Sequence, residues 1–266
     1  MTAPRLVATD LDGTVVDRRG EISDRTVAAL KALEERGVPV VFVTGRPPRW
    51  MAEVAARTGH TGLAVCANGA IVYDLHREEV VETSPIAVDV GLDVARRLRA
   101  ALPQVAFAVE TDAGFAHEET YVARWDVGRA SAVDVIEAIY DRPAVKLLAR
   151  HEDMDPDSLL AAAREVAGDL VELTHSSSTG LLEISAAGVS KASALARLAE
   201  RQGIGAADVV AFGDMPNDLP MLAWAGTAYG IRTGHPDVVA AAERLVDGPE
   251  DDGVARELER LFDLCP

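Results

Sequence analysis

The sequence predicts an α/β protein in which a parallel sheet with crossover helices is interrupted by an inserted α/β segment. Apolar runs alternate with amphipathic helical patterns from residue 6 to residue 67, and the same rhythm resumes from residue 191. Between about Thr83 and Gly188 the alternation changes. Strands joined through helices in one sheet run parallel, so the two outer segments are expected to form a single core sheet.

The first outer segment is expected to fold as strand, helix, strand, helix, strand. A serine and a glycine bound the first helix, and two prolines and a glycine bound the second, as is typical of helix ends. The expected strands are residues 6–8, 38–43 and 63–67, and the bounding residues are Ser23, Gly37, Pro47, Pro48 and Gly59. Asn68-Gly69 then predicts a hairpin to a further strand at residues 71–73.

The insertion holds enough predicted elements for a small α/β domain of its own. Its expected helices are residues 89–102, 133–140 and 156–167, and its expected strands are residues 105–109, 145–149, 170–173 and 181–184. Strands at residues 209–212, 228–231 and 245–246 follow it, between helices at residues 191–202, from 216, near 238 and at 254–262. The predicted domains are therefore residues 1–82 with 190–266, and residues 83–189.

The bulk composition excludes several classes of function. The 266 residues include 26 Lys and Arg against 43 Asp and Glu, a formal net charge of −17. A nucleic-acid groove needs clustered cations, and the sequence has no such cluster. Cys66 and Cys265 lie far apart and predict neither a disulfide framework nor a metal site. Because no stretch near the start is apolar enough for a signal peptide or membrane helix, we expect a cytoplasmic protein without a membrane partner.

The most informative motif is Asp10-Leu11-Asp12-Gly13-Thr14, which follows the apolar run at residues 6–8. Ligand sites in open α/β sheets collect where parallel strands end. Asp10 can act there as a nucleophile, and Asp12 can pass a proton to a leaving group, provided a metal ion offsets the negative charge. A calcium loop and a structural aspartate pair are plainer alternatives. The calcium loop fits poorly, since its glycine belongs at position six and Gly13 comes fourth.

Three further segments place polar groups at strand ends or helix starts. Thr44-Gly45-Arg46 offers a hydroxyl and an unhindered N–H, which are phosphate-binding groups. Lys191 opens a helix, where a positive charge is unfavourable for the helix dipole. This placement suggests that its ammonium is directed at an anion. The segment Gly213-Asp214-Met215-Pro216-Asn217-Asp218 contains two acids. Asp214 and Asp218 are spaced so that both can face a cation at the end of the first strand. Each segment also has a structural explanation, namely a turn, a surface lysine and a capped helix.

Together these segments resemble the haloacid dehalogenase superfamily, specifically its Cof-type phosphatases with a large α/β cap. The resemblance covers essentially the whole chain. It rests on Asp10-Leu11-Asp12-Gly13-Thr14, Thr44-Gly45-Arg46, Asn68-Gly69-Ala70, Gly188-Val189-Ser190-Lys191, and Gly213-Asp214 with Asn217-Asp218, in the family's order and spacing. The implied fold is a Rossmann-like parallel-sheet core with an inserted α/β cap, and we expect the cap to be a mobile lid.

The resemblance implies a Mg²⁺-dependent phosphatase. Asp10 would attack phosphorus and form an aspartyl-phosphate, while Asp12 would protonate the leaving alcohol and then activate the hydrolytic water. Mg²⁺ would be bound by the side chains of Asp10 and Asp214 and by the backbone carbonyl of Asp12, and Asp218 would hold a metal-bound water. True dehalogenases lack the second aspartate because a halide leaves unprotonated, so Asp12 favours a phosphatase.

The resemblance also implies the residues that hold the phosphoryl group. Thr44, the N–H of Gly45 and Lys191 would bind its oxygens, and Asn217 would position Lys191. The expected substrate is a small phosphorylated metabolite, with a sugar phosphate as the preferred candidate. Candidate residues for recognising the rest of the substrate are Arg46, Glu183 and the loop Ser176-Ser177-Ser178.

Two alternative functions remain open. A phosphomutase of the phosphomannomutase kind would need a second cationic phosphate site in the insertion. The only dense cation group there is Arg96, Arg97 and Arg99. A non-catalytic protein that binds phosphorylated metabolites would be expected to have lost at least one catalytic residue, and none is missing. We expect a monomer or a weak homodimer.

Overall fold

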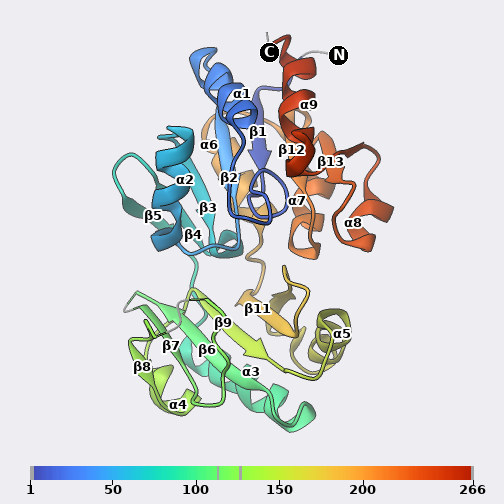
Figure 1. Ribbon diagram of the computed structural model, residues 1–266. Helices are drawn as coiled ribbons and strands as arrows, with labels where there is room; N and C mark the ends of the chain where they lie inside the picture. Colours follow the sequence, from blue (N-terminus) through green and yellow to red (C-terminus); the bar gives the residue numbers. More distant parts are fainter. Residues whose placement is uncertain (1–2, 113, 126–127, 265–266) are drawn as a thin grey trace. The chain divides into compact units, whose positions relative to one another are not determined.

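The computed structural model describes residues 3–112, 114–125 and 128–264, so Cys265 lies outside the described residues (Figure 1). The chain divides into two compact units. The first is built from Met1–Glu82 and Ser190–Pro266, and the second from Thr83–Val189. Each unit contains its own sheet and its own hydrophobic core.

The first unit is built on an eight-stranded sheet in the order β14-β13-β12-β1-β2-β3-β4-β5. Its strands are β1 (Leu6–Thr9), β2 (Val40–Val43), β3 (Leu63–Cys66), β4 (Ile71–Asp74), β5 (Glu79–Thr83), β12 (Val209–Gly213), β13 (Thr227–Ile231) and β14 (Leu245–Val246). The neighbours from β14 to β3 pair in parallel, and β4 forms an antiparallel hairpin with β3. The predicted α/β fold with a parallel sheet is therefore confirmed, and so is the hairpin at Asn68-Gly69.

Helices cover both faces of this sheet. They are α1 (Asp24–Glu35), α2 (Met51–Thr58), α6 (Lys191–Arg201), α7 (Leu219–Trp224), α8 (Pro236–Ala241) and α9 (Gly253–Phe262). Apolar side chains of α6, α7 and α8 pack with alternate residues of the strands, while α1, α2 and α9 lie on the other face (Figure 1). The expected end signals are present: the Ser23 side chain caps α1, and Gly59 ends α2 with a φ of 72°.

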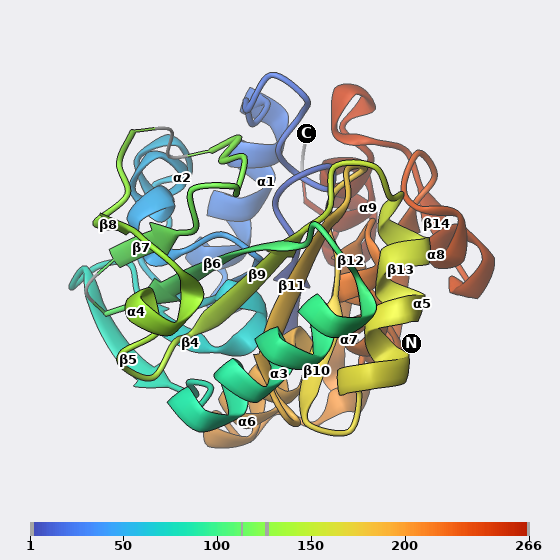
Figure 2. The same cartoon turned by 90° about the horizontal axis from the view of Figure 1, so that it is seen from below.

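The second unit is built on a six-stranded sheet in the order β10-β11-β9-β6-β7-β8. Its elements are α3 (Val88–Ala101), β6 (Ala106–Thr111), β7 (Gly114–His117), β8 (Ala132–Val133), α4 (Ile136–Ile139), β9 (Lys146–Arg150), α5 (Pro156–Ala167), β10 (Val171–Thr174) and β11 (Leu181–Ala186). Pairing is antiparallel except between β7 and β8. Figure 2 shows α3 and α5 lying over these strands, and their apolar residues form the unit's main core.

One predicted helix of the second unit is wrong in its extent. Residues 133–140 were expected to be helical, but Ala132–Val133 form strand β8 and the helix begins only at Ile136. The buried carboxylate of Glu118 explains the boundary, because its Oε1 accepts the N–H of Ile136 at 3.1 Å and its Oε2 accepts the N–H of Phe107 at 2.9 Å. Strand β7 was also missed, since four residues beginning with a glycine carry too little pattern to predict a strand.

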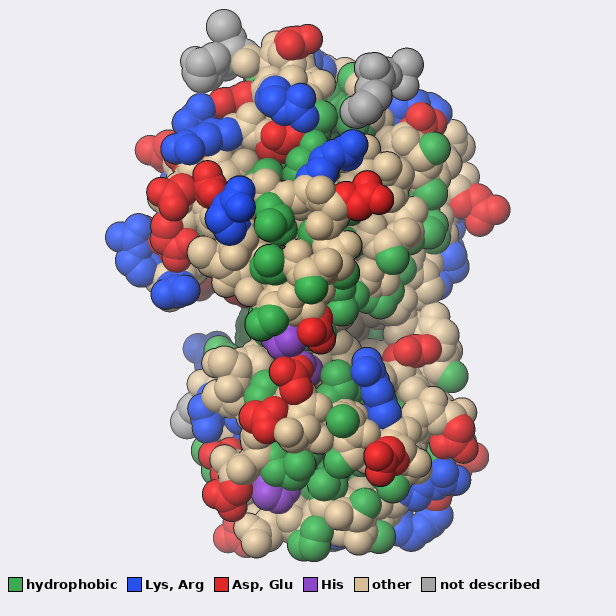
Figure 3. Space-filling view, turned by 90° about the vertical axis from the view of Figure 1, so that its right-hand side faces the viewer, with side chains coloured by type: hydrophobic (Ala, Val, Ile, Leu, Met, Phe, Trp, Pro, Cys, Tyr) green, Lys and Arg blue, Asp and Glu red, His purple; other side chains and the backbone are tan. Residues whose placement is uncertain are grey.

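Charged side chains of both signs lie on the molecular surface. On the face drawn in Figure 3, acidic and basic side chains are interspersed over both units, and no basic patch stands out among the described residues. Within those same residues, no helix has the length and apolar character needed to cross a membrane.

Candidate active site

Three loops of the first unit meet where β1, β2 and β12 end. Strand β1 lies between the other two, and Thr9 at its end is aligned with Phe42 of β2 and Phe212 of β12. The chain leaves β1 for β2 on one side and returns much later to β12 on the other. This is the switch point at which open α/β sheets bind ligands. The residues that follow the three strands are Asp10, Thr44 and Asp214.

Three carboxylates and one ammonium form the centre of this site. Asp10, Asp214 and Asp218 are buried, and each offers an oxygen within 4.8 Å of the others. The Nζ of Lys191, also buried, donates to Oδ1 of Asp10 and to Oδ1 of Asp218, both at 2.6 Å. Sequence reasoning had named all four residues, and the fold brings them together from separations of up to 208 positions (218 minus 10).

The electrostatics of this centre are dominated by burial and excess negative charge. Burial raises the pKa of Asp10 well above its ordinary value, and Asp218 and Asp214 add to this effect against the opposing influence of Lys191. Burial and Asp218 likewise raise the pKa of Asp214 to about 7. Burial lowers the pKa of Lys191, but the carboxylates of Asp10 and Asp218 outweigh it and raise that pKa overall. One ammonium therefore does not neutralise three carboxylates.

A divalent cation fits this donor set. Hard cations such as Mg²⁺ prefer carboxylate oxygens, and a cation would offset the burial and the mutual repulsion that raise both aspartate pKa values. The oxygens of Asp218 are already engaged, because Oδ1 accepts from Lys191 and Oδ2 accepts the N–H groups of Asp214 and Met215, each at 3.0 Å. Asp10 and Asp214 are consequently better placed to be direct ligands than Asp218.

The Asp214 carboxylate is held by the first motif. The Oγ1 of Thr14 donates to its Oδ1 at 3.0 Å. Gly13 has a φ of +85°, and a Cβ at this position would lie 2.3 Å from Oδ2 of Asp214. Only glycine permits both the backbone conformation and this close approach. The motif alone assigns Thr14 no role, although its position beside Gly13 is a sequence signal for one.

Thr44 and Gly45 form the second loop of the site. The Oγ1 of the buried Thr44 accepts the N–H of Arg46 at 3.0 Å, which leaves the hydroxyl proton available to a ligand. Backbone bonds join this loop to the β3–β4 turn: the N–H of Asn68 donates to the carbonyl of Thr44, and the N–H of Ala67 to that of Arg46, both at 3.0 Å. These bonds fix the direction in which the loop leaves β2.

Lys191, the first residue of helix α6, reaches the site from outside these three loops. A capping box formed by Ser190 and Ser193 starts the helix. Gly69 packs against it so closely that a Cβ would lie 2.2 Å from the carbonyl oxygen of Ser190. The structure joins Lys191 to Asp218, whereas the Nδ2 of Asn217 donates to Oδ1 of Asn68 at 3.1 Å.

Asp12 and Arg46 form a bidentate ion pair beside this centre. The Nε of Arg46 donates to Oδ2 of Asp12 at 2.8 Å, and Nη2 donates to Oδ1 at 2.5 Å. The Asp12 side chain is 60% exposed, against 17% for Arg46. The pairing with Asp12 raises the pKa of Arg46. The guanidinium of a residue considered for substrate binding is therefore engaged by the candidate acid.

Glu183 belongs to the second unit. It lies on β11 opposite Leu148 of β9, and Lys146 and Arg150 of β9 share its sheet face, opposite the core that α3 and α5 form. The Nζ of Lys146 donates to Oε2 of Glu183 at 2.5 Å, and the hydroxyl of Ser176 donates to Oε1. Lys146 was missed from the sequence, although a lysine inside the apolar run at residues 145–149 was a usable signal.

Within the described residues, the acidic centre that could hold a cation contains no histidine.

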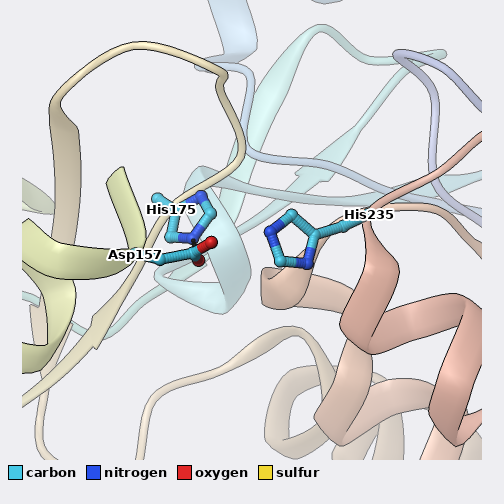
Figure 4. A group of neighbouring side chains, drawn as sticks. All are labelled: Asp157, His175 and His235. Atoms are coloured by element: carbon cyan, nitrogen blue, oxygen red, sulfur yellow. Dashed lines mark hydrogen bonds and ion pairs between the residues drawn. The ribbon is translucent and has the colours of Figure 1, made fainter. Parts of the chain in front are cut away.

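Two histidines outside this centre have partners within their own units. In the second unit, Nε2 of His175 lies 2.9 Å from Oδ1 of Asp157 (Figure 4). In the first unit, His235, also drawn in Figure 4, accepts the N–H of Asp237 on Nδ1 at 3.2 Å and so caps α8. The centre formed by Asp10, Asp214 and Asp218 therefore offers only carboxylate oxygens, which suit Mg²⁺ rather than zinc.

Comparison with known proteins gives a consistent result. The sequence model of the haloacid dehalogenase-like hydrolases matches residues 7–258. The chain is 28% identical over 273 residues to the 5-amino-6-(5-phospho-D-ribitylamino)uracil phosphatase YitU of Bacillus subtilis, with 99% of each protein covered. It is 26% identical over 274 residues to the pyridoxal phosphate phosphatase YbhA of Escherichia coli, covering 95% of this chain and 96% of that protein.

A solved structure shows the same fold. SMU.1108c from Streptococcus mutans superposes with a TM-score of 0.85 at 20% sequence identity. The superposition covers 98% of this chain and 100% of that one.

Proposed function

The chain belongs to the haloacid dehalogenase-like hydrolases and is a phosphatase of small phosphorylated substrates, and we propose that it is Mg²⁺-dependent and acts on a sugar phosphate through an aspartyl-phosphate. The observation that carries this proposal is the buried contact of Lys191 with Asp10 and Asp218, beside Asp214. An ammonium held between a nucleophile and further acids is suited to neutralising a phosphoryl group during transfer.

The reaction begins at Asp10. Lys191 binds Oδ1 of this carboxylate, and Oδ2 attacks phosphorus in line with the ester oxygen. The bond from phosphorus to the ester oxygen breaks, and Asp12 gives that oxygen its proton. Water then attacks the phosphorus of the aspartyl-phosphate, and Asp12 takes a proton from this water as the bond to Asp10 breaks. Inorganic phosphate leaves, and both aspartates return to their starting states.

Asp10 and Asp214, with the backbone carbonyl of Asp12, would hold Mg²⁺. When bound, the cation supplies positive charge next to the transferring phosphoryl group. Asp218 holds Lys191 and, through Oδ2, the backbone at Asp214 and Met215. In this role Asp218 supports the ligand set and can hold a metal-bound water without being a direct ligand.

Thr44, Gly45 and Lys191 bind the phosphoryl oxygens in the proposed complex. The hydroxyl proton of Thr44 is available for this purpose because its oxygen already accepts the N–H of Arg46. Gly45 presents its N–H without a side chain in the way. Asn217 supports this region through its bond to Asn68, next to the start of α6.

We assign the second unit the role of a substrate-specificity cap. The sheet face opposite the α3 and α5 core carries Lys146 and Glu183, both buried, and Ser176 from the β10–β11 loop is bonded to Glu183. This connected group offers donors and acceptors suited to the hydroxyls of a sugar or polyol. The name of the Bacillus subtilis relative describes a phosphate on a ribityl chain, which is a substrate of this chemical class. Neither the phosphomutase nor the non-catalytic alternative is favoured by an observation of comparable weight.

A screen of phosphorylated metabolites tests the proposal. Purified protein is assayed for phosphate release with Mg²⁺, with EDTA, and as the Asp10→Asn variant. Sugar and polyol phosphates are expected to be the best substrates, and both EDTA and the substitution are expected to remove the activity. Activity that survives exhaustive chelation, or equal turnover of unrelated phosphate esters, would contradict the metal or the substrate class respectively.

A further inference from the structure

The pair between Arg46 and Asp12 assigns a function to Arg46. Both carboxylate oxygens of Asp12 accept hydrogen bonds from the guanidinium, at 2.8 and 2.5 Å. These are the hydrogen bonds that the Asp12 side chain makes within the described residues. Since that side chain is 60% exposed, little else restrains its rotamer. Arg46 therefore determines where the carboxylate lies.

Arg46 is itself held firmly. Its N–H donates to Oγ1 of Thr44, and its carbonyl accepts the N–H of Ala67, each at 3.0 Å. Pro47, which follows, has the fixed φ of a proline, here −72°. The side chain is largely covered, with 17% of its surface exposed. A rigid, preorganised arginine fork loses little entropy when it binds a carboxylate.

We propose that Arg46 is a positioning residue that acts through Asp12 and does not bind the substrate. This inference rests on the proposed function, in which Asp12 moves a proton to the leaving oxygen and from the hydrolytic water. When one oxygen of Asp12 takes part in proton transfer, the hydrogen bond to the other oxygen keeps the carboxylate in place. A bidentate partner suits this task, because one of its two bonds can be released at a time.

Leaving-group dependence separates this role from substrate binding. Phenyl phosphate and 4-nitrophenyl phosphate have nearly the same shape, but phenol leaves well only when protonated, whereas 4-nitrophenolate leaves as a stable anion. The value of kcat/KM reports the step in which the phenol departs. For Arg46→Met we expect kcat/KM to fall about 10- to 100-fold on phenyl phosphate and less than about 3-fold on 4-nitrophenyl phosphate, as a displaced proton donor predicts.

A double-mutant cycle with Asp12→Asn tests whether the two residues act together. Asp12→Asn should show the same leaving-group dependence more strongly. Adding Arg46→Met to Asp12→Asn should then reduce kcat/KM on phenyl phosphate by less than about 2-fold, since the group that Arg46 positions is already lost. Equal losses on both substrates for Arg46→Met, or full additivity in the double variant, would overturn the inference and make Arg46 a substrate-binding residue.

Two more variants control for folding. Arg46→Lys keeps the charge and one donor, so it should restore part of the lost kcat/KM and provide the same comparison if the methionine variant is unstable. Arg25→Met removes another bidentate pair of this unit, between Arg25 and Glu259 at 2.8 and 2.6 Å, and should leave the ratio of the two substrates unchanged. If Asp12→Asn lacks leaving-group dependence, the proposed role of Asp12 fails as well. If only Arg46→Met lacks it, this inference alone fails.

Discussion

Each unit of the molecule buries one lysine against carboxylates, and the two lysines differ in what surrounds them. Lys191 of the first unit begins a helix and binds Asp10 and Asp218, with Asp214 close by. Lys146 of the second unit lies in strand β9 and binds Glu183, whose other oxygen is bound by Ser176. Around Lys191, burial and neighbouring carboxylates raise the pKa values of Asp10 and Asp214. A bound cation would offset this excess of negative charge.

This difference separates chemistry from recognition. Raised carboxylate pKa values at a strand-end site are typical of groups that react or bind metal. In contrast, the Lys146, Glu183 and Ser176 group is a chain of paired donors and acceptors, which in the proposed cap role would exchange partners with substrate hydroxyls. The first unit should therefore decide whether any phosphate ester is cleaved, and the second unit should decide which one.

The largest effect is expected from Asp10→Asn. The substitution removes the attacking oxygen and should reduce kcat on every substrate by more than about 1,000-fold, as loss of a nucleophile does. It should not destabilise the fold, because it neutralises a carboxylate whose ionised form is disfavoured by burial. Steady-state assays and thermal melting measure both properties. Turnover within about 10-fold of the parent, in a folded protein, would remove Asp10 from the nucleophile role.

Replacing Mg²⁺ by Ca²⁺ should have the next largest effect. Calcium has a larger and more flexible coordination shell, so Asp10 can bind it with both oxygens and lose its attacking geometry. We expect at least about a 10-fold loss of kcat with Ca²⁺, and recovery when excess Mg²⁺ is added. Equal rates with the two ions would mean that Asp10 and Asp214 do not share a cation during the reaction.

Lys146→Met should change substrate preference and leave the chemistry intact. We expect kcat/KM on the best sugar phosphate to fall about 10- to 100-fold, since Glu183 would lose its ammonium partner, while 4-nitrophenyl phosphate should change less than about 3-fold. Arg142→Met, which removes an exposed pair with Asp141, is the matched control. A uniform loss on all substrates would erase the distinction between the two units.

The smallest effect concerns the pH dependence of stability without metal. The pKa of Asp214 is raised to about 7 in the folded protein, so its stabilising contribution is present below the unfolded value near 4 and is lost as the pH rises through 7. Relative to Asp214→Asn, the metal-free parent should therefore lose on the order of a few kcal/mol of unfolding free energy between pH 5 and pH 8. Urea unfolding measures this, and saturating Mg²⁺ should reverse most of the loss. If the parent and the variant had parallel pH profiles of unfolding free energy, the pKa of Asp214 would not be raised in the folded protein.

The sequence predicted the residues of the acidic centre because each follows a strand or opens a helix, and parallel strands deliver such positions to one sheet edge. Asp10 and Asp214 needed only that topology, whereas the role of Lys191 came from the family resemblance. The pairing of Arg46 with Asp12 could not be predicted, because it depends on how backbone bonds to Ala67 and Asn68 turn the loop after β2.

The second unit was harder to predict in detail. The Lys146 and Glu183 contact depends on the antiparallel register of β9 and β11, which aligns Leu148 with Glu183. The misplaced start of helix α4 depends on a buried Glu118 whose partners come from other elements. Antiparallel register and buried polar groups are set by tertiary contacts, so local periodicity does not reveal them.

Trapping the covalent intermediate shows whether Asp10 is the nucleophile. The Asp12→Asn variant is mixed with 4-nitrophenyl phosphate and Mg²⁺, quenched in acid and analysed by peptide mass spectrometry. Because this leaving group needs no proton but hydrolysis of the intermediate needs a base, we expect Asp10 to gain one phosphoryl group in step with a burst of 4-nitrophenolate. The double variant Asp10→Asn with Asp12→Asn should show neither. A phosphoryl group on another residue, or a burst without any modification of Asp10, would exclude Asp10 as the nucleophile.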